Sequence, residues 1–166
     1  MITEELKKAD HIPAEVTEIV KDSVINTFAS ICGEPPQHLE IEDDNKEPLN
    51  GIIGNIAVFN PELTFSLMMA IPRETAMKIS EAFIGIELPF ESDDMGDLIG
   101  EIANILAGDV AANIEKIGFR GQSSLPTATR GSDLTLFMPN KPPTVKLKFS
   151  GVCGDFLLNM AMSESK

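Results

Sequence analysis

The chain has 166 residues, of which 43% are hydrophobic and 23% are charged, as is typical of a folded domain and not of a disordered chain. Its 26 Asp and Glu residues outnumber its 13 Lys and Arg residues, so the formal net charge is −13 at pH 7. Nucleic acid and anionic membranes are therefore excluded as expected partners, because binding to phosphate groups needs a basic surface. The acidity itself fits solubility, or a protein partner with a basic or mixed surface.

Residues 1–12 are predicted to be a polar N-terminal lead, which lacks the apolar stretch of a secretory signal. Residues 13–166 are predicted to form a single domain, and their longest strongly apolar run, 63–71, is too short to cross a bilayer. Cys32 and Cys153 belong to no CxxC pair and have glycine and apolar neighbours, which predicts buried, reduced thiols. We expect a cytoplasmic protein.

The first half of the domain is predicted to form a helix, a short strand and a hairpin. The helix begins after Pro13 and ends at Gly33, which two prolines follow closely. Alternating and β-rich runs predict strands over residues 38–42, 52–59 and 63–71. The turn Asn60-Pro61-Glu62 indicates that the last two strands form a hairpin.

Pro72 opens a second helix, which Gly85 ends, and an acidic loop then leads to a long amphipathic helix. Ser92 or Asp93 can cap the long helix, which extends to Lys116. Its apolar face is predicted to consist of Met95, Leu98, Ile99, Ile102, Ile105, Leu106, Val110 and Ile117.

Further strands are predicted over residues 124–131, 132–138, 144–150 and 155–162. The order of helix, strand and paired strands thus occurs twice, which indicates an internal αβββ duplication. We predict an α+β fold with a mostly antiparallel sheet and two long helices packed on one of its faces.

The usual signatures of a self-contained active site are missing from the sequence. It has no GxxxxGK[ST] loop, no GxGxxG turn and no GxSxG elbow. His11 and His38 lack a second ligand residue at metal spacing and are expected at the surface or at a strand edge. The acidic cluster Glu42-Asp43-Asp44 lacks the alternation of a calcium loop and is expected to be a solvated loop. The sequence therefore predicts neither a nucleophile nor a metal site.

Asp97, Glu101 and Asn104 form one row on the long helix, because their directions lie within about 60° of one another at 3.6 residues per turn. Gly108 and Ala111, which have almost no side chain, continue this row. The amide of an Asn can hold a water molecule, and a Glu one turn away can pair with a cation on a docked molecule. On spacing alone, ordinary exposed residues of a solvated helix remain the simpler interpretation.

The segment IGEIANILAGDVAANIE resembles the signature helix of the CheC/CheX family of chemotaxis phosphatases. The family pattern is Asp or Ser, three residues, Glu, two residues and Asn, with a structural Pro some twenty residues later. Asp97, Glu101, Asn104 and Pro126 fit this pattern. The preceding helix and the acidic loop are similar to those of CheX-type members in particular, and the likeness extends over residues 71–126.

The resemblance implies a phosphatase that hydrolyses the aspartyl phosphate on a CheY-like receiver domain of a response regulator. Glu101 would bind a lysine of the receiver, and Asn104 would orient the attacking water. The docking surface would include Asp97, Gly108 and Ala111. Since the Mg²⁺ would belong to the receiver, no cofactor or metal of the chain's own is expected.

The resemblance also implies one site and a homodimer, which are features of CheX-type members. The first helix shows no second site, because Asp22 and Asn26 stand four positions apart and no Glu precedes Asn26 by three. Two other interpretations stay open. One is a non-catalytic CheX-like module that docks on or sequesters a receiver, and the other is a purely structural dimerisation domain.

Overall fold

The computed structural model describes residues 2–41 and 47–165, so the predicted loop cluster Glu42-Asp43-Asp44 lies outside the described residues. The helices in this part of the chain are α1 (Ile2–Lys8), α2 (Ala14–Cys32), α3 (Arg73–Ile84) and α4 (Asp93–Glu115). Its strands are β1 (Gln37–Leu39), β2 (Leu49–Phe59), β3 (Leu63–Pro72), β4 (Gln122–Ser123), β5 (Thr127–Leu134), β6 (Thr144–Gly151) and β7 (Gly154–Glu164).

The described strands form one sheet with the order β1-β6-β7-β3-β2-β4, in which β5 also pairs with β2 and all pairs are antiparallel. The hairpins β2–β3 and β6–β7 lie next to each other, because β3 pairs with β7. Asn60 shapes the first hairpin, since its Oδ1 accepts hydrogen bonds from the backbone N–H groups of Glu62 and Leu63, both at 2.8 Å. The predicted hairpin is confirmed.

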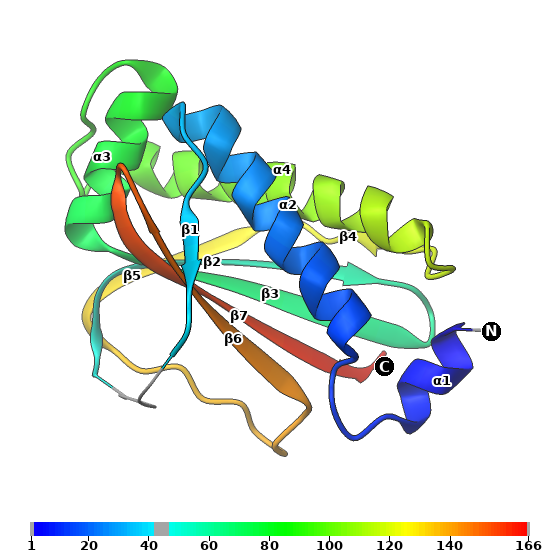
Figure 1. Ribbon diagram of the computed structural model, residues 1–166. Coiled ribbons are helices and arrows are strands. Elements are labelled where there is room, and N and C mark those ends of the chain that lie inside the picture. The colour runs from blue at the N-terminus through cyan, green and yellow to red at the C-terminus, as the bar shows by residue number, and fades with distance from the viewer. Residues whose placement is uncertain (1, 42–46, 166) are drawn as a thin grey trace.

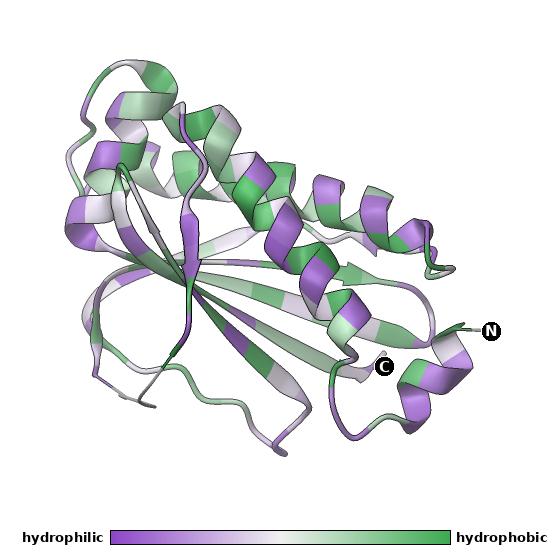
Figure 2. Ribbon diagram, viewed as in Figure 1, coloured by the Kyte–Doolittle hydropathy of each residue, from purple (hydrophilic) through white to green (hydrophobic). Residues whose placement is uncertain are grey.

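Helices α2 and α4 lie over the same face of the sheet, with α3 near one end of both (Figure 1). Hydrophobic and hydrophilic residues alternate along both long helices (Figure 2), as their amphipathic sequences require. Their apolar sides and one face of the sheet form the main core, where Phe28 of α2 stacks on Phe156 of β7 with 4.3 Å between the ring centroids. The predicted α+β fold is confirmed.

A smaller apolar cluster lies on the opposite face of the sheet. Its buried members are Ile53, Met68, Ala70 and Ala161. Leu134 and Met138, from the end of β5 and the connection to β6, pack against them. The partly buried residues that pack against this cluster come from strands β2, β5 and β7 and, at Met138, from the connection between β5 and β6.

The strand predicted over residues 132–138 is wrong, because β5 continues through the expected break and ends at Leu134. Gly131 does not interrupt the strand, since it pairs with Gly51 of β2. The irregularity comes later, at Asp133, where the register with β2 shifts and the backbone has a positive φ of 98°. One bulged strand therefore replaces the two that were predicted.

Two other sequence expectations change. Residues 1–12 are not only a polar lead, because they contain α1, whose Leu6 is 1% exposed and belongs to the main core. Ile105 was predicted on the apolar face of α4 but is 40% exposed. At 3.6 residues per turn it points between the apolar stripe and the row of Glu101 and Asn104, at the margin of the buried side.

The two cysteines meet where the end of α2 approaches the turn between β6 and β7. The thiol of Cys153 donates a hydrogen bond to Sγ of Cys32 at 3.1 Å, and both cysteines are free. Cys153 is buried, as predicted, whereas Cys32 is only partly buried. Burial raises the pKa of Cys32 to about 12, and the neighbouring thiol of Cys153 adds to the shift.

Candidate functional site

A groove between α4 and the start of β5 brings the residues of the predicted motif together. Its volume is about 390 Å³. The groove is lined by Gly96, Asp97, Gly100, Glu101, Asn104, Pro126, Thr127 and Ala128. The polar row of α4 therefore faces the proline that the sequence pattern links to it.

Pro126 packs over the backbone of α4 at Gly100. A methyl group placed on Gly100 would lie 3.7 Å from Cγ of the proline, which is ordinary van der Waals contact. A side chain longer than methyl at this position would enter the groove. Gly100 thus keeps space open beside Glu101.

Glu101 and Asn104 are both exposed, and neither side chain forms a hydrogen bond or ion pair with another residue in the described part of the chain. The carboxylate of Glu101 is therefore available to a cation on a docked molecule. The carboxamide of Asn104 can donate to one partner and accept from another, which is what holding a water molecule requires. The roles predicted for these two residues stay predictions.

Gly108 and Ala111 lie outside the groove lining, further along α4. Gly108 is exposed, and a methyl group placed on it would meet no other residue within 4 Å. Ala111 is partly buried and packs against the main core. Their predicted docking role would therefore extend the contact beyond the groove, along the same helix.

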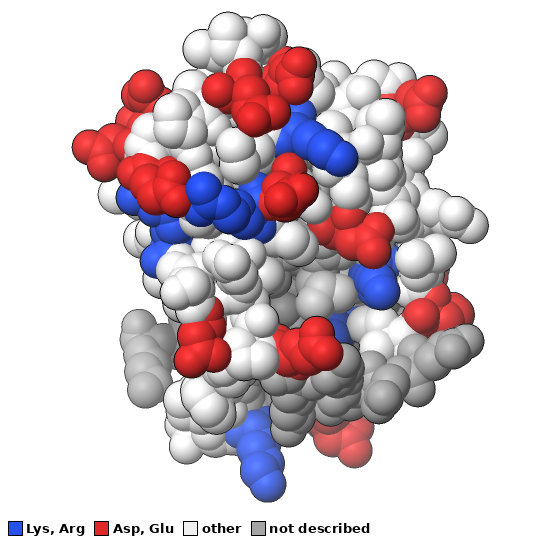
Figure 3. All heavy atoms as spheres, turned by 90° about the vertical axis from the view of Figure 1, so that its left-hand side faces the viewer, with Lys and Arg blue, Asp and Glu red and all other residues white. Residues whose placement is uncertain are grey.

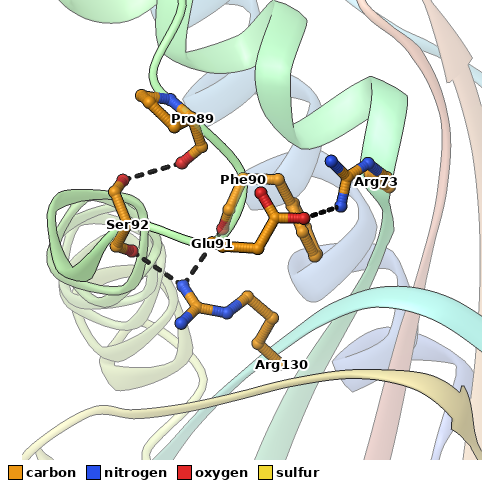
Figure 4. A network of polar contacts seen from close by, with 6 residues as sticks. All are labelled: Arg73, Pro89, Phe90, Glu91, Ser92 and Arg130. Carbon is orange, nitrogen blue, oxygen red and sulfur yellow. Dashed lines mark hydrogen bonds and ion pairs between the residues drawn. The ribbon is translucent and has the colours of Figure 1, made fainter.

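Arg130 of β5 holds one wall of the groove to the other (Figure 4). Its Nη1 donates hydrogen bonds to the carbonyl oxygens of Phe90 at 3.0 Å and of Ser92 at 2.7 Å. Ser92 is the N-cap of α4, because its Oγ accepts a hydrogen bond from the backbone N–H of Met95 at 3.2 Å. Arg130 thus ties the edge strand to the first turn of the helix.

Arg73, at the start of α3, contacts the same loop from the other side (Figure 4). It forms an ion pair with Glu91, and its guanidinium carbon lies 4.7 Å from the centroid of the Phe90 ring. The hydrogen bond from Arg73 lowers the pKa of Glu91. Both side chains of this ion pair are in contact with solvent, so it positions the loop more than it stabilises the fold.

Sequence reasoning missed both arginines. Neither lies at a recognisable spacing from the motif, and Arg130 reaches the helix only because β5 pairs with β2. A signal for them would have required knowledge of this long-range pairing.

Acidic side chains are spread over the end of the molecule that carries α3 and the following loop, with Lys and Arg side chains between some of them (Figure 3). Asp93 and Asp94 lie in the first turn of α4, one turn before the groove residue Asp97, and both are exposed. The approach to the groove is therefore acidic, which favours a partner with a basic surface.

The two histidines take no part in the groove. His11 is exposed and contacts Asp10, and His38 lies on the edge strand β1, so both are placed as predicted. Across residues 2–41 and 47–165, no three His, Cys, Asp or Glu side chains gather in a way that could hold a metal ion.

The fold is that of CheC-like and CheX proteins of known structure. A CheC-like superfamily protein from Shewanella sp. PV-4 is 16% identical with a TM-score of 0.81, over 92% of this chain and 99% of that chain. The chemotaxis protein CheX from Vibrio vulnificus is 17% identical with a TM-score of 0.80, over 90% of this chain and 100% of that chain. CheX in the CheX-CheY-BeF3-Mg²⁺ complex from Borrelia burgdorferi is 16% identical with a TM-score of 0.69, over 90% and 98%.

The sequence comparison assigns the chain to a more specific family than the structural comparison does. The family described as chemotaxis phosphatase CheX matches residues 52–150, which is more than half of the chain. The chain therefore belongs to the CheX family, and the resemblance seen in the signature helix is confirmed. No curated protein sequence matches the chain.

Within the described part of the chain, none of the helices combines the length and the apolar character that a membrane span requires. The expected cytoplasmic location stays a prediction.

Proposed function

We propose that this chain hydrolyses the aspartyl phosphate of a CheY-like receiver domain. The observation that carries the proposal is one groove in which Glu101 and Asn104 lie a turn apart, exposed and opposite Pro126. Membership of the CheX family and the fold shared with the CheX of the Borrelia CheX-CheY complex support a CheY-like partner.

In the proposed mechanism, the carboxylate of Glu101 pairs with a lysine beside the phosphorylated aspartate of the receiver. The pair strengthens as docking removes water from around it. Asn104 then extends into the receiver's site and orients a water molecule in line with the bond between phosphorus and the aspartyl oxygen. The water oxygen bonds to phosphorus, the aspartyl oxygen leaves as a carboxylate, and inorganic phosphate retains the hydrogens of the water.

Positioning is the main contribution that these residues make in the mechanism. Holding a nucleophile in an attack geometry can lower a barrier by about 7 kcal/mol or more. Asn104 does not titrate, so its role needs no particular protonation state. We assign the Mg²⁺ that balances the phosphoryl charge to the receiver, and no metal to this chain.

The docking surface that we propose follows α4. Asp97 lies at the rim of the groove, and Gly108 and Ala111 leave the helix surface low beyond Asn104. A receiver can then lie close against the helix while Asn104 reaches its phosphorylated aspartate.

We also propose that the chain forms a homodimer. β6 and β7 are each paired on both sides, so a sheet continued between two copies must begin at an edge strand. β5 is such a strand among those described, since it pairs only with β2 and most of its residues are exposed. Light scattering of the purified chain tests this, and a mass of one chain over the working concentration range contradicts it.

The catalytic proposal is tested with purified receivers that are phosphorylated in the presence of Mg²⁺. Loss of the phosphoryl group is followed with and without a small amount of this chain, and with Asn104→Ala. We expect the natural chain to accelerate the loss, and Asn104→Ala to bind the receiver without accelerating it. Equal acceleration by Asn104→Ala contradicts the mechanism. Binding by the natural chain without acceleration supports the non-catalytic docking module instead.

A further inference from the structure

Leu125 is the most exposed large hydrophobic side chain in the described part of the chain, with 89% of its surface in contact with solvent. Single exposed leucines are common on proteins and need no explanation. What distinguishes Leu125 is its place, directly before Pro126 in the wall of the groove. An exposed apolar residue is therefore the immediate sequence neighbour of a residue that lines the polar groove.

The backbone before Leu125 is held firmly to the sheet. The backbone N–H of Ser124 donates to the carbonyl oxygen of Ala57 at 2.9 Å. In return, the backbone N–H of Ala57 donates to Oγ of Ser124, also at 2.9 Å. These two hydrogen bonds fix the position of Ser124, the residue directly before Leu125.

The backbone after Leu125 is restricted as well. Pro126 has a fixed φ, and a proline limits the residue before it to extended conformations. Thr127 then rejoins the sheet by pairing with Asn55. Leu125 thus lies between two anchored points.

The segment between these points has one residue more than the part of β2 opposite it. Ser123 pairs with Val58, and Thr127 pairs with Asn55, so three residues of this segment lie opposite two of β2. Residues 124–126 belong to neither β4 nor β5, and the extra residue interrupts the strand pairing there, which fits the exposure of Leu125.

A second exposed apolar residue adjoins the motif on α4, outside the groove lining. Ile105 directly follows Asn104 on α4 and is 40% exposed. Two exposed apolar residues therefore adjoin residues of the motif in sequence, Ile105 beside Asn104 and Leu125 beside Pro126. A polar centre with apolar neighbours is the usual composition of a protein docking surface, because the apolar contacts exclude water from the polar ones.

We propose that Leu125 is the apolar anchor of receiver docking, and that it enters an apolar recess on the receiver beside the phosphorylated aspartate. This inference rests on the proposed function, since it takes the receiver as the partner. The fixed backbone of Leu125 favours binding, because little conformational freedom is lost when the side chain is captured. The contact acts on docking and not on the attacking water, so it changes KM and leaves kcat unchanged.

The test compares Leu125→Ala and Leu125→Met with the natural chain. Since Leu125 is exposed, both variants are expected to fold, which circular dichroism checks. Receiver dissociation constants are measured in the Asn104→Ala background, where hydrolysis does not interfere, and KM and kcat are measured in the active chain. Phe137→Ala is the matched control, because Phe137 is 79% exposed but neither it nor a residue next to it lines the groove.

We expect Leu125→Ala to raise both the dissociation constant and KM about tenfold or more, as for loss of one buried leucine side chain, with kcat unchanged. Leu125→Met should bind nearly as well as the natural chain, and Phe137→Ala should show no change.

An unchanged dissociation constant in Leu125→Ala overturns the inference while leaving the proposed function intact. Weaker receiver binding by Leu125→Ala in a chain that shows no hydrolysis supports the anchor and contradicts the catalytic proposal. If the natural chain neither binds nor hydrolyses, both proposals fail. If Leu125→Ala reduces self-association of the chain but not receiver binding, Leu125 contacts a second copy of the chain and the inference is overturned.

Discussion

Arg130 of the edge strand and Ser92 at the start of α4 are joined by a 2.7 Å hydrogen bond from Nη1 of the arginine to the carbonyl oxygen of the serine. The strand supplies one wall of the groove and the helix supplies the other. The spacing between the walls therefore depends on a contact outside the motif itself.

Replacing Arg130 by Ala should lower both stability and hydrolysis. Two hydrogen bonds to carbonyl oxygens are lost, and for an exposed donor we expect the free energy of unfolding to fall by about 1 kcal/mol. Because the walls of the groove can then shift, we expect kcat/KM to fall about tenfold, as for a lost interaction worth about 1.4 kcal/mol. Urea unfolding and the receiver assay measure the two effects.

Arg120→Ala is the control for this variant, because Arg120 is 88% exposed and its ion pair with Glu115 lies away from the groove. Arg130→Lys should restore part of the activity, since a lysine can still reach one carbonyl oxygen. Unchanged hydrolysis in Arg130→Ala would show that the bond does not position the walls.

Asn104 and Asn113 lie on the same helix, and we expect opposite effects from their replacement. Asn113 donates to Oγ of Ser23 at 3.3 Å, whereas Asn104 forms no such bond with a described residue. Asn104→Ala should therefore abolish hydrolysis without loss of stability, and Asn113→Ala should preserve hydrolysis. Both variants gain the same helix propensity from the change of Asn to Ala. The expected difference between their free energies of unfolding, about 1 kcal/mol, therefore measures the hydrogen bonding lost by Asn113. If the two variants were equally stable and both had lost hydrolysis, the different roles given to Asn104 and Asn113 would be contradicted.

Glu101→Gln should weaken receiver binding by removing the ion pair with the receiver lysine. We expect the dissociation constant to rise about threefold to tenfold at low salt, with a weaker dependence on salt than in the natural chain. Isothermal titration in the Asn104→Ala background at several salt concentrations measures this. Glu115→Gln removes the same charge at the far end of α4 and should leave binding nearly unchanged. If the receiver dissociation constants of Glu101→Gln and of the natural chain depended equally on salt, the proposed pairing of Glu101 with a receiver lysine would be contradicted.

Substitutions at Gly108 test the stability of the helix and the docking of the receiver separately. Gly108→Ala should raise the free energy of unfolding by about 0.8 kcal/mol, the usual gain for this change inside a helix. The added methyl group meets no other residue within 4 Å, so hydrolysis should stay close to that of the natural chain. Gly108→Phe should also fold but should weaken receiver binding, because the ring occupies the low surface beside the groove. Full binding by Gly108→Phe would place the receiver elsewhere on α4.

The thiol of Cys32 should make stability depend on alkaline pH. Its pKa is raised from 9.0 to about 12, chiefly by burial, so the folded chain keeps this proton where the unfolded chain releases it. Stability should therefore fall as pH rises above about 9, because the unfolded state then binds fewer protons. Urea unfolding at a series of pH values compares the natural chain with Cys32→Ala, in which this part of the slope should vanish. The chain has no tyrosine, and its lysines are common to both proteins, so the comparison isolates Cys32. A slope unaffected by Cys32→Ala would contradict the raised pKa.

Local sequence was sufficient for much of this fold. Prolines before α2 and α3, and glycines in the left-handed conformation after them, mark the ends of both helices as predicted. The row of Asp97, Glu101 and Asn104 follows from helical periodicity alone, because a helix repeats its directions within a few residues. These features depend on neighbours along the chain, and so they can be read from it.

Contacts between distant segments could not be read in this way. The course of β5 past Gly131 depends on its pairing with β2, and helical periodicity placed Ile105 on the apolar face although it is 40% exposed. The meeting of Pro126 with the helix, the bond from Arg130 and the outward position of Leu125 arise from the same pairing. The motif thus specifies which polar groups are available on one helix. Only the packing of an edge strand against that helix makes them a groove, because local periodicity carries no information about which strand will lie opposite.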